Sequence, residues 1–158
     1  MRLHSRNTGV LVLAVGICLA SCREVPEQPT EWLTGSVESG DGVLISYQMA
    51  GEGPVSVVFV HGWSCDRSYW KEQLDHFAQV HRVVAIDLAG HGDSGLNRDD
   101  WTLPAFGQDV AAVINGLGLE RIVLVGHSMG GLVAGEYAVR HATDVKVVVQ
   151  HLFCKLVV

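Results

Sequence analysis

The sequence predicts an α/β fold, in which a mainly parallel β-sheet carries helices on its faces. Two runs of mostly apolar residues, Val55–Val60 and Arg82–Asp87, are typical of strands that are buried on both faces. Segments with helical spacing of apolar residues lie between these strands and later ones, and this alternation indicates βαβ units. Gly-rich loops follow several of the strands, and in open sheets of this kind sites form at the carboxyl ends of the strands.

The first elements are a predicted hairpin and a helix. The turn residues Ser39-Gly40-Asp41-Gly42 precede the strand-like segment Val43–Met49, which favours a hairpin. Ser68–Gln79 places its apolar residues at helical spacing. Leu88–Trp101 is polar and rich in glycine, and we expect a loop there.

A second helix begins after Thr102, whose side chain is suited to an N-cap. Pro104 falls in the first turn, where its missing N–H costs nothing. Gly116 and Gly118 mark the end of the helix. One apolar stripe runs along it, formed by Leu103, Phe106, Val110, Val113 and Leu117.

The next segment places a serine at the apex of a sharp turn. The strand Arg121–Val125 leads into Gly126-His127-Ser128-Met129-Gly130, and the helix Gly130–His141 follows. A serine hydroxyl is a poor nucleophile unless it is held in the open beside a base, and a strained strand-to-helix turn holds it there. Glycines are needed on both sides because a Cβ would clash. Val145–Val149 is predicted as one more strand and as the edge of the sheet.

The first 21 residues have the features of an export signal. Arg2 and Arg6 are basic, Val10–Ala20 is apolar but too short to cross a bilayer, and small residues precede Cys22. The run Leu19-Ala20-Ser21-Cys22 resembles a bacterial lipobox, which implies a signal peptide over 1–21 and a lipid anchor on Cys22. An ordinary signal peptide cut nearby and a poor membrane anchor are the alternatives. Arg23 follows the cysteine, and the resemblance then favours the outer membrane over the inner one.

A tether over residues 22–35 joins this signal to a globular domain over 36–158. The tether contains two prolines, three glutamates and little apolar content, so it cannot fold alone. Without residues 1–21, the chain has nine basic against seventeen acidic residues, a balance of −8. This balance excludes nucleic acid as a partner and electrostatic docking on membranes. Cys65 and Cys154 are the remaining cysteines, and either a bridge or two free thiols is open.

Three motifs, each after a predicted strand, resemble the α/β-hydrolase superfamily. They are His61-Gly62-Trp63, the run D-L-A-G-H-G-D-S over 87–94, and G-H-S-M-G-G over 126–131. The resemblance covers roughly Val43–Val149, the N-terminal half of an α/β-hydrolase-type fold, so the domain is expected to be incomplete at its C-terminus.

The resemblance implies a role for each motif. Ser128 would be the nucleophile, and the backbone N–H groups of Met129 and Trp63 would form the oxyanion hole. His127, His61 and His91 are expected to have structural roles, as is Asp87. No pair of histidines has metal-ligand spacing with a plausible third ligand, so we expect no metal, and the resemblance implies no cofactor.

The acid and the base of a catalytic triad have no candidate in this chain. In the family the order is serine, acid and histidine, and both partners follow later strands. Asp144 precedes a strand, His141 ends a helix at the opposite edge, and His151 follows a strand other than the last one of the family. The chain is therefore predicted to be truncated or frame-disrupted, and weakly active or inactive.

The function predicted from these observations is that of a serine hydrolase that cleaves carboxylic esters through an acyl-serine. Its partners would be a small acyl substrate and, through the lipid on Cys22, a membrane. Thioesters, lactones and the carbon–carbon bonds of diketones stay open as substrates. A non-catalytic protein and a cofactorless haloperoxidase are the alternatives, and an aspartate-nucleophile relative is disfavoured because position 128 is serine.

Overall fold

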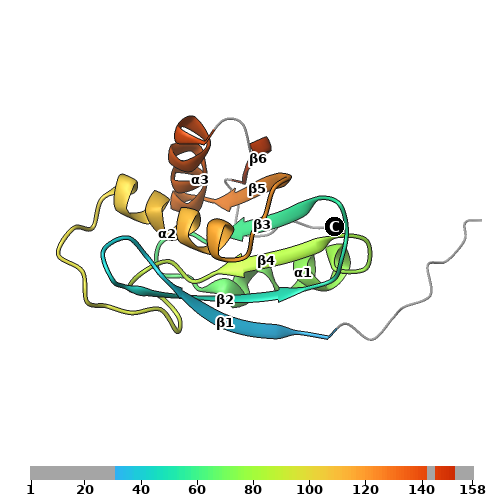
Figure 1. Ribbon diagram of the computed structural model, residues 1–158, viewed down its shortest axis with the longest axis horizontal. Helices are drawn as coiled ribbons and strands as arrows, with labels where there is room; N and C mark the ends of the chain where they lie inside the picture. Colours follow the sequence, from blue (N-terminus) through green and yellow to red (C-terminus); the bar gives the residue numbers. More distant parts are fainter. Residues whose placement is uncertain (1–30, 142–144, 152–158) are drawn as a thin grey trace, which may run out of the picture.

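A six-stranded mixed sheet forms the centre of the molecule, with the strand order β1-β2-β4-β3-β5-β6 (Figure 1). The computed structural model describes residues 31–141 and 145–151. The predicted signal peptide, Cys22 and most of the predicted tether therefore lie outside the described residues. Among the described helices, none is both long enough and apolar enough to span a bilayer.

Two strands form an antiparallel hairpin at one edge, and the other four run parallel. The hairpin consists of β1, Leu33–Glu38, and β2, Leu44–Ala50, and β2 pairs antiparallel with β4. The parallel strands pair in the order β4, β3, β5 and β6. Their bounds are Ser56–Val60 for β3, Arg82–Ile86 for β4, Ile122–His127 for β5 and Val145–His151 for β6.

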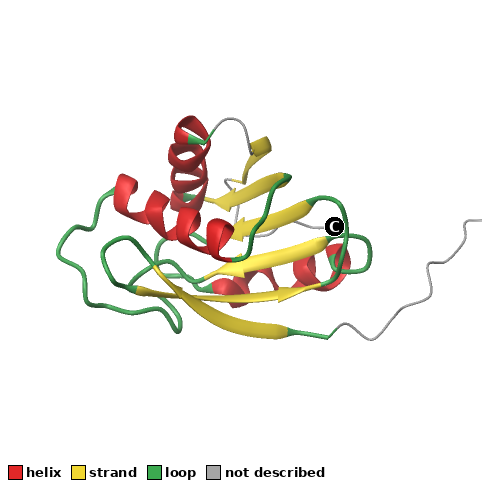
Figure 2. Ribbon diagram, in the orientation of Figure 1, coloured by secondary structure: helices red, strands yellow, loops and turns green. Residues whose placement is uncertain are grey.

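Helices cover both faces of the sheet (Figure 2). The 3₁₀-helix η1, Arg67–Trp70, and the helix α1, Lys71–Phe77, pack on one face. The longer helices α2, Leu103–Gly116, and α3, Met129–Arg140, pack side by side on the other face. Every parallel connection in the described sheet thus carries helical structure, as βαβ units require.

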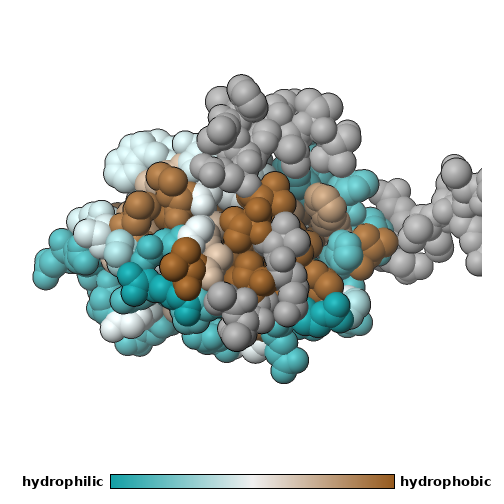
Figure 3. Space-filling model, turned by 90° about the horizontal axis from the view of Figure 1, so that it is seen from above, coloured by the Kyte–Doolittle hydropathy of each residue, from teal (hydrophilic) through white to brown (hydrophobic). Residues whose placement is uncertain are grey.

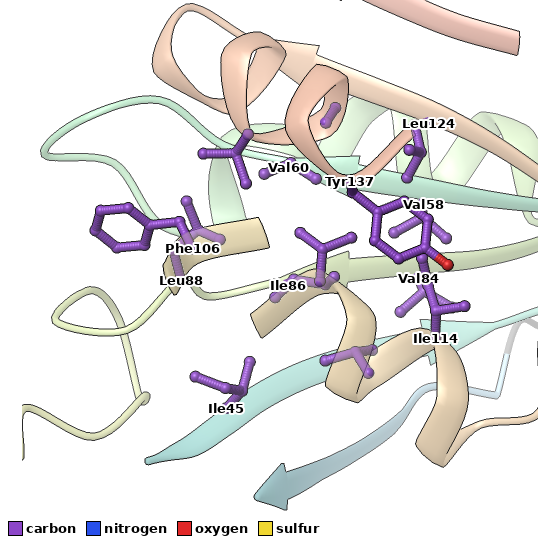
Figure 4. Close-up of a cluster of buried hydrophobic side chains, with 14 of the residues drawn as sticks. Ile45, Val58, Val60, Val84, Ile86, Leu88, Phe106, Ile114, Leu124 and Tyr137 are labelled. Carbon is purple, nitrogen blue, oxygen red and sulfur yellow. The ribbon is translucent and has the colours of Figure 1, made fainter. Parts of the chain in front are cut away.

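Alternate residues of the central strands build two separate cores. In β3, Val58 and Val60 belong to the core under α2 and α3, whereas Val57 and Phe59 belong to the core under α1. β4 alternates in the same way, because successive strand side chains point to opposite faces. Figure 4 shows the larger core, where Tyr137 from α3 and Phe106 from α2 lie over the strand residues.

The predicted α/β fold with a mainly parallel sheet is confirmed, and so are most of its elements. The predicted hairpin is present, and the Oγ1 of Thr102 accepts a hydrogen bond from the N–H of Ala105, as its predicted N-cap role requires. Phe106, Val110 and Val113 are buried, as the stripe predicts.

Three details differ from the sequence-based expectations. β1 begins at Leu33, inside the segment predicted as tether, because pairing with Met49 gives its backbone hydrogen-bond partners. The helix predicted over Ser68–Gln79 divides into η1 and α1. Leu103 of the predicted stripe is exposed, since it lies in the first turn of α2 at the rim of the domain.

One face of the molecule is apolar around α3 and β6. Seen from the α3 side, hydrophobic residues gather in the centre and hydrophilic residues around the periphery (Figure 3). The exposed large apolar residues of these two elements are Leu132 and Val139 of α3 and Val148 and Val149 of β6. β6 ends the described sheet, so the prediction that this segment forms a sheet edge is confirmed for the described residues.

Candidate active site

Ser128 occupies the turn between β5 and α3 in a backbone conformation that side chains rarely adopt. Its φ is 51° and its ψ is −118°. Only one other non-glycine residue in the described part of the chain, Ser64, has a positive φ. Non-glycine residues hold such conformations at a cost of about 1–3 kcal/mol, so surrounding contacts must enforce this one.

Close packing of the backbone on both sides of Ser128 supplies those contacts. A Cβ on Gly126 would lie 2.5 Å from the Cα of Gly131, and a Cβ on Gly130 would lie 2.8 Å from the carbonyl carbon of Val60. Neither glycine has a positive φ. Glycine is therefore required at both positions because a side chain would clash, and not because of the backbone conformation. The first turn of α3 is therefore pressed directly against the end of β3.

The loop after β3 lies against the same turn. A Cβ added to Gly62 would be 3.2 Å from the Cβ of Ser128 and 2.8 Å from Nδ1 of His127. Trp63 follows Gly62 directly, so the loop that carries Trp63 begins against the serine turn. The structure thus brings together the Trp63 loop and Ser128, which are 65 residues apart in the sequence.

Buried His61 fixes the peptide between Gly62 and Trp63. Its Nε2 accepts a hydrogen bond from the N–H of Leu88 at 3.0 Å, so its Nδ1 carries the proton and donates to the Gly62 oxygen at 2.8 Å. The N–H of Cys65 donates to the same oxygen. In a trans peptide the N–H points opposite to the C=O, so the Trp63 N–H points away from the His61 ring. Burial lowers the pKa of His61, which keeps this ring neutral.

Met129 carries the second backbone N–H that the sequence analysis predicted for an oxyanion hole. It is the first residue of α3, and the first N–H groups of a helix have no partner within it. The partial positive charge of a helix N-terminus adds to the attraction for an anion at this position. Ser128 itself is exposed, so its hydroxyl is open to a substrate.

The structural roles predicted for the neighbouring side chains agree with their contacts. The ring of His127 stacks on Tyr69 with centroids 4.4 Å apart. Nδ1 of His91 lies 3.0 Å from the carbonyl oxygen of Ala89. Asp87 is buried and accepts hydrogen bonds from the backbone N–H of Arg67 at 2.7 Å and from its guanidinium. These three side chains hold the loops around Ser128 in place.

A buried ion pair behind the site was missed by the sequence analysis. Arg98 and Asp109 are both fully buried side chains, joined by two hydrogen bonds of 2.6 and 3.1 Å. Asp109 also accepts from Ser39 Oγ at 3.0 Å and from the Ala89 N–H at 3.2 Å. Arg98 donates further to Asp41 at 2.7 Å. The sequence feature that could have indicated this buried pair is Asp109, which lies three residues after Phe106 and next to the apolar stripe of α2.

A triad acid and base are not brought to Ser128 by the described residues. The backbone of His151 pairs with that of His127 at the end of β6, but its side chain is outside the description, and Asp144 and Cys154 lie outside the described residues. Cys65 is a free, half-buried thiol. Within residues 31–141 and 145–151, no group of three potential ligand side chains could hold a metal ion.

Comparisons with known proteins agree on one protein family. A profile of the Alpha/beta hydrolase family matches residues 57–154. The acetyltransferase component of an acetoin cleaving system from Cupriavidus necator is 40% identical over 99 residues, which are 63% of this chain and 26% of that protein. A bifunctional esterase/perhydrolase from Acinetobacter calcoaceticus is 38% identical over 112 residues, which are 70% of this chain and 41% of that protein.

A solved structure agrees with these relatives in fold. Est816, described as an N-acyl homoserine lactone degrading enzyme, superposes with a TM-score of 0.70 at 36% identity, over 73% of this chain and 44% of that one. The relatives of the chain include esterases, epoxide hydrolases and haloperoxidases. The chain spans less than half the length of the acetyltransferase component, of the esterase/perhydrolase and of Est816.

Proposed function

Because the chain belongs to the Alpha/beta hydrolase family, we propose that it carries the nucleophile and oxyanion hole of a serine hydrolase that acts on carboxylic esters. The observation that carries this proposal is the conformation of Ser128, which is strained, exposed and flanked by the Trp63 loop. Backbone strain of this kind, which a glycine at the same position would relieve, is typical of functional sites. The esterase activity named for one relative supports the choice of esters.

The proposed reaction begins with attack of the Ser128 Oγ on the ester carbonyl carbon. The carbonyl oxygen becomes an oxyanion, which accepts hydrogen bonds from the N–H groups of Trp63 and Met129. Collapse of this intermediate breaks the bond to the alcohol, which leaves with a proton, and an acyl-serine remains. Attack by water on the acyl-serine releases the carboxylic acid and restores the hydroxyl.

Removal of the hydroxyl proton needs a base that the described residues do not bring to Ser128. His61 already uses both ring nitrogens, and His127 packs against Tyr69. Loss of the base from a triad leaves the contributions of the oxyanion hole and of binding, roughly 10³–10⁴ over the reaction in water. Turnover supported by the described residues alone is therefore expected to be slow.

Labelling with a fluorophosphonate tests the proposal without requiring turnover. We expect stoichiometric labelling of the folded chain, because attack by Oγ on phosphorus with loss of fluoride uses the same oxyanion hole. Ser128→Ala removes the label. Ser64→Ala, at the other exposed serine with a positive φ, keeps it. Folded protein that takes no label would support the non-catalytic alternative.

Perhydrolysis is a second candidate, favoured by the esterase/perhydrolase relative. Here hydrogen peroxide would replace water as the nucleophile that attacks the acyl-serine, and a peracid would leave. Formation of peracid from acetate and peroxide, lost in Ser128→Ala, distinguishes this reaction from ester hydrolysis.

Export and lipid anchoring remain proposals that rest on the N-terminal sequence. We propose that cleavage before Cys22 leaves a lipid-modified N-terminus in the outer membrane, with residues 22–35 as the tether. Metabolic labelling with palmitate in a bacterial host tests this, with Cys22→Ser as the control. A chain of unchanged mass that takes up no palmitate would exclude the anchor.

A further inference from the structure

A groove lies beside α1, on the face of the sheet opposite α2 and α3 (Figure 1). Because α1 packs mainly on β4, the same face of the neighbouring strand β2 is left open. The groove has η1 and α1 on one side and β2 and Trp32 on the other, and we call it the α1 groove. Its volume of about 330 Å³ falls within the range of small-molecule sites. Neither Trp63 nor Ser128 lines it.

The apolar part of the α1 groove comes from an indole ring and a leucine. Trp32 is half-buried and packs against the core under α1. Leu74 belongs to that core and is 2% exposed. An indole ring that is held against a core offers a flat face on which another ring can stack. These two side chains therefore favour a ligand with a planar ring.

The side-chain amide of Gln48 is the uncharged polar group that β2 adds to the α1 groove. Met49 packs on the core under α2 and α3, whereas Ala50 belongs to the core under α1. Since side chains alternate along a strand, Gln48 faces the same side as Ala50. Gln48 is half-buried, and no described residue forms a hydrogen bond with its amide. The amide carries N–H donors beside a C=O acceptor, so both functions are available to a ligand.

The charged side chains along the α1 groove already have partners of opposite charge. The guanidinium of Arg67 donates hydrogen bonds to Asp87 and to Asp93. The Nζ of Lys71 lies 2.6 Å from a carboxylate oxygen of Asp75. A charged ligand would have to compete with these pairs, whereas an uncharged one would leave them intact. The electrostatics of the α1 groove therefore favour an uncharged ligand.

We propose that the α1 groove binds an uncharged planar heterocycle of nucleobase size that carries a hydrogen-bond donor beside an acceptor. The ring would stack on Trp32, and its donor–acceptor edge would form two hydrogen bonds with the Gln48 amide. Glutamine and asparagine amides pair with adenine through two hydrogen bonds in the same manner. A phosphate on the ligand would gain little, because Arg67 and Lys71 are already paired.

This site does not depend on the chemistry of Ser128, so it can fail or hold separately from the proposed hydrolase function. Ser128→Ala is expected to bind the heterocycle like the parent chain while it loses the fluorophosphonate label.

Saturation-transfer difference NMR of the full chain, titrated with uracil or with hypoxanthine, tests the proposal. Both compounds are uncharged near neutral pH and carry a ring N–H beside a C=O. We expect saturable binding. 1,3-Dimethyluracil keeps the uracil ring but has no N–H, and it is expected to bind about fivefold more weakly, since one hydrogen bond is lost.

Substitutions at the two proposed contacts locate the binding. Gln48→Ala removes both hydrogen bonds and is expected to weaken the binding of uracil about tenfold or more. Trp32→Leu removes the stacking face and is expected to weaken it about tenfold. Gln108→Ala, at an exposed glutamine of α2 on the opposite face of the sheet, is the matched control and keeps the binding.

Gln48→Glu keeps the test decisive if Gln48→Ala unfolds, because the carboxylate has the same shape as the amide but no N–H to donate. It is also expected to lose binding of uracil. Failure of the folded parent chain to bind either compound would overturn the proposal, as would unchanged binding by a folded Gln48 variant. Equal binding of uracil and 1,3-dimethyluracil would overturn it too. Tighter binding of uridine monophosphate than of uridine would show that the α1 groove attracts phosphate and would also contradict it.

Discussion

The substitution Asp109→Asn isolates the buried ion pair that ties the loop after β4 to α2. The asparagine has nearly the same volume but no charge, and its amide NH₂ would face the N–H donors of Arg98. Asp41, whose side chain is 34% exposed, would then be the one carboxylate still paired with Arg98. A fully buried guanidinium would thus lose the partner with which it makes two hydrogen bonds.

The expected loss is about 3–5 kcal/mol in the free energy of unfolding, because breaking a buried pair leaves an uncompensated charge. Domains of this size have a total of about 5–15 kcal/mol, so the variant would lie near the limit of folding. The double variant Arg98→Met/Asp109→Asn removes both charges. We expect it to lose at least about 2 kcal/mol less than the sum of the two single variants.

Equilibrium unfolding in urea, followed by tryptophan fluorescence, measures these differences. Lys71 and Asp75 form an exposed pair on α1 and provide the matched control. Asp75→Asn is expected to cost less than about 0.5 kcal/mol, since exposed helix pairs contribute little. A loss below about 1 kcal/mol for Asp109→Asn, or equal losses at both sites, would refute the reasoning.

Three further predictions concern the site itself. Ser128→Gly is expected to raise the free energy of unfolding by about 1 kcal/mol, since relief of backbone strain exceeds the added entropy of the unfolded chain. Urea unfolding in which Ser128→Gly is no more stable than Ser128→Ala would contradict this prediction. Gly130→Ala is expected to lower the free energy of unfolding by about 3 kcal/mol or more, because the added Cβ would overlap the backbone of Val60. Gly135→Ala is the control in the same unfolding experiment, because no atom lies within 4 Å of its added Cβ. Burial lowers the pKa of His61 in the folded chain below its ordinary value of 6.5. Between the folded and unfolded pKa values, the unfolded chain therefore binds more protons than the folded chain. The contribution of neutral His61 to the free energy of unfolding is then fully present above pH 6.5 and is lost as pH falls through the folded-state pKa. His61→Asn removes that part of the pH dependence in urea unfolding between pH 5 and 7.5, and an unaltered profile would exclude His61 as its source.

The parts of the fold that the sequence predicted are those with strong local patterns. β3 and β4 are continuous apolar runs, and α2 combines a cap, a proline in its first turn and a regular stripe. β1 lacked such a pattern because it is an edge strand with mostly exposed side chains, and a glycine lies within it. The turn residues before β2 indicated a hairpin, but the start of β1 at Leu33 depends on its pairing with Met49 of β2, which no local pattern reveals.

The site divides in the same way. Gly126, Ser128 and Gly130 stand within five residues, so their shared turn could be predicted from sequence. The contact between Gly62 and Ser128 depends on β3 and β5 being neighbours in parallel register, and only the resemblance to a family suggested it. The Arg98–Asp109 pair had no such guide, because its partners Ser39 and Ala89 come from other elements.

The strain at Ser128 connects stability with the proposed chemistry. The turn holds its φ only because three glycines let the ends of β3 and β5 and the start of α3 approach without side chains between them. That close approach is also what places the Trp63 loop beside the serine. A larger residue at Gly62 would therefore separate the two donors before it unfolded the domain. The glycines consequently belong to the proposed site as much as the serine does, and their replacement is expected to abolish fluorophosphonate labelling in chains that still fold.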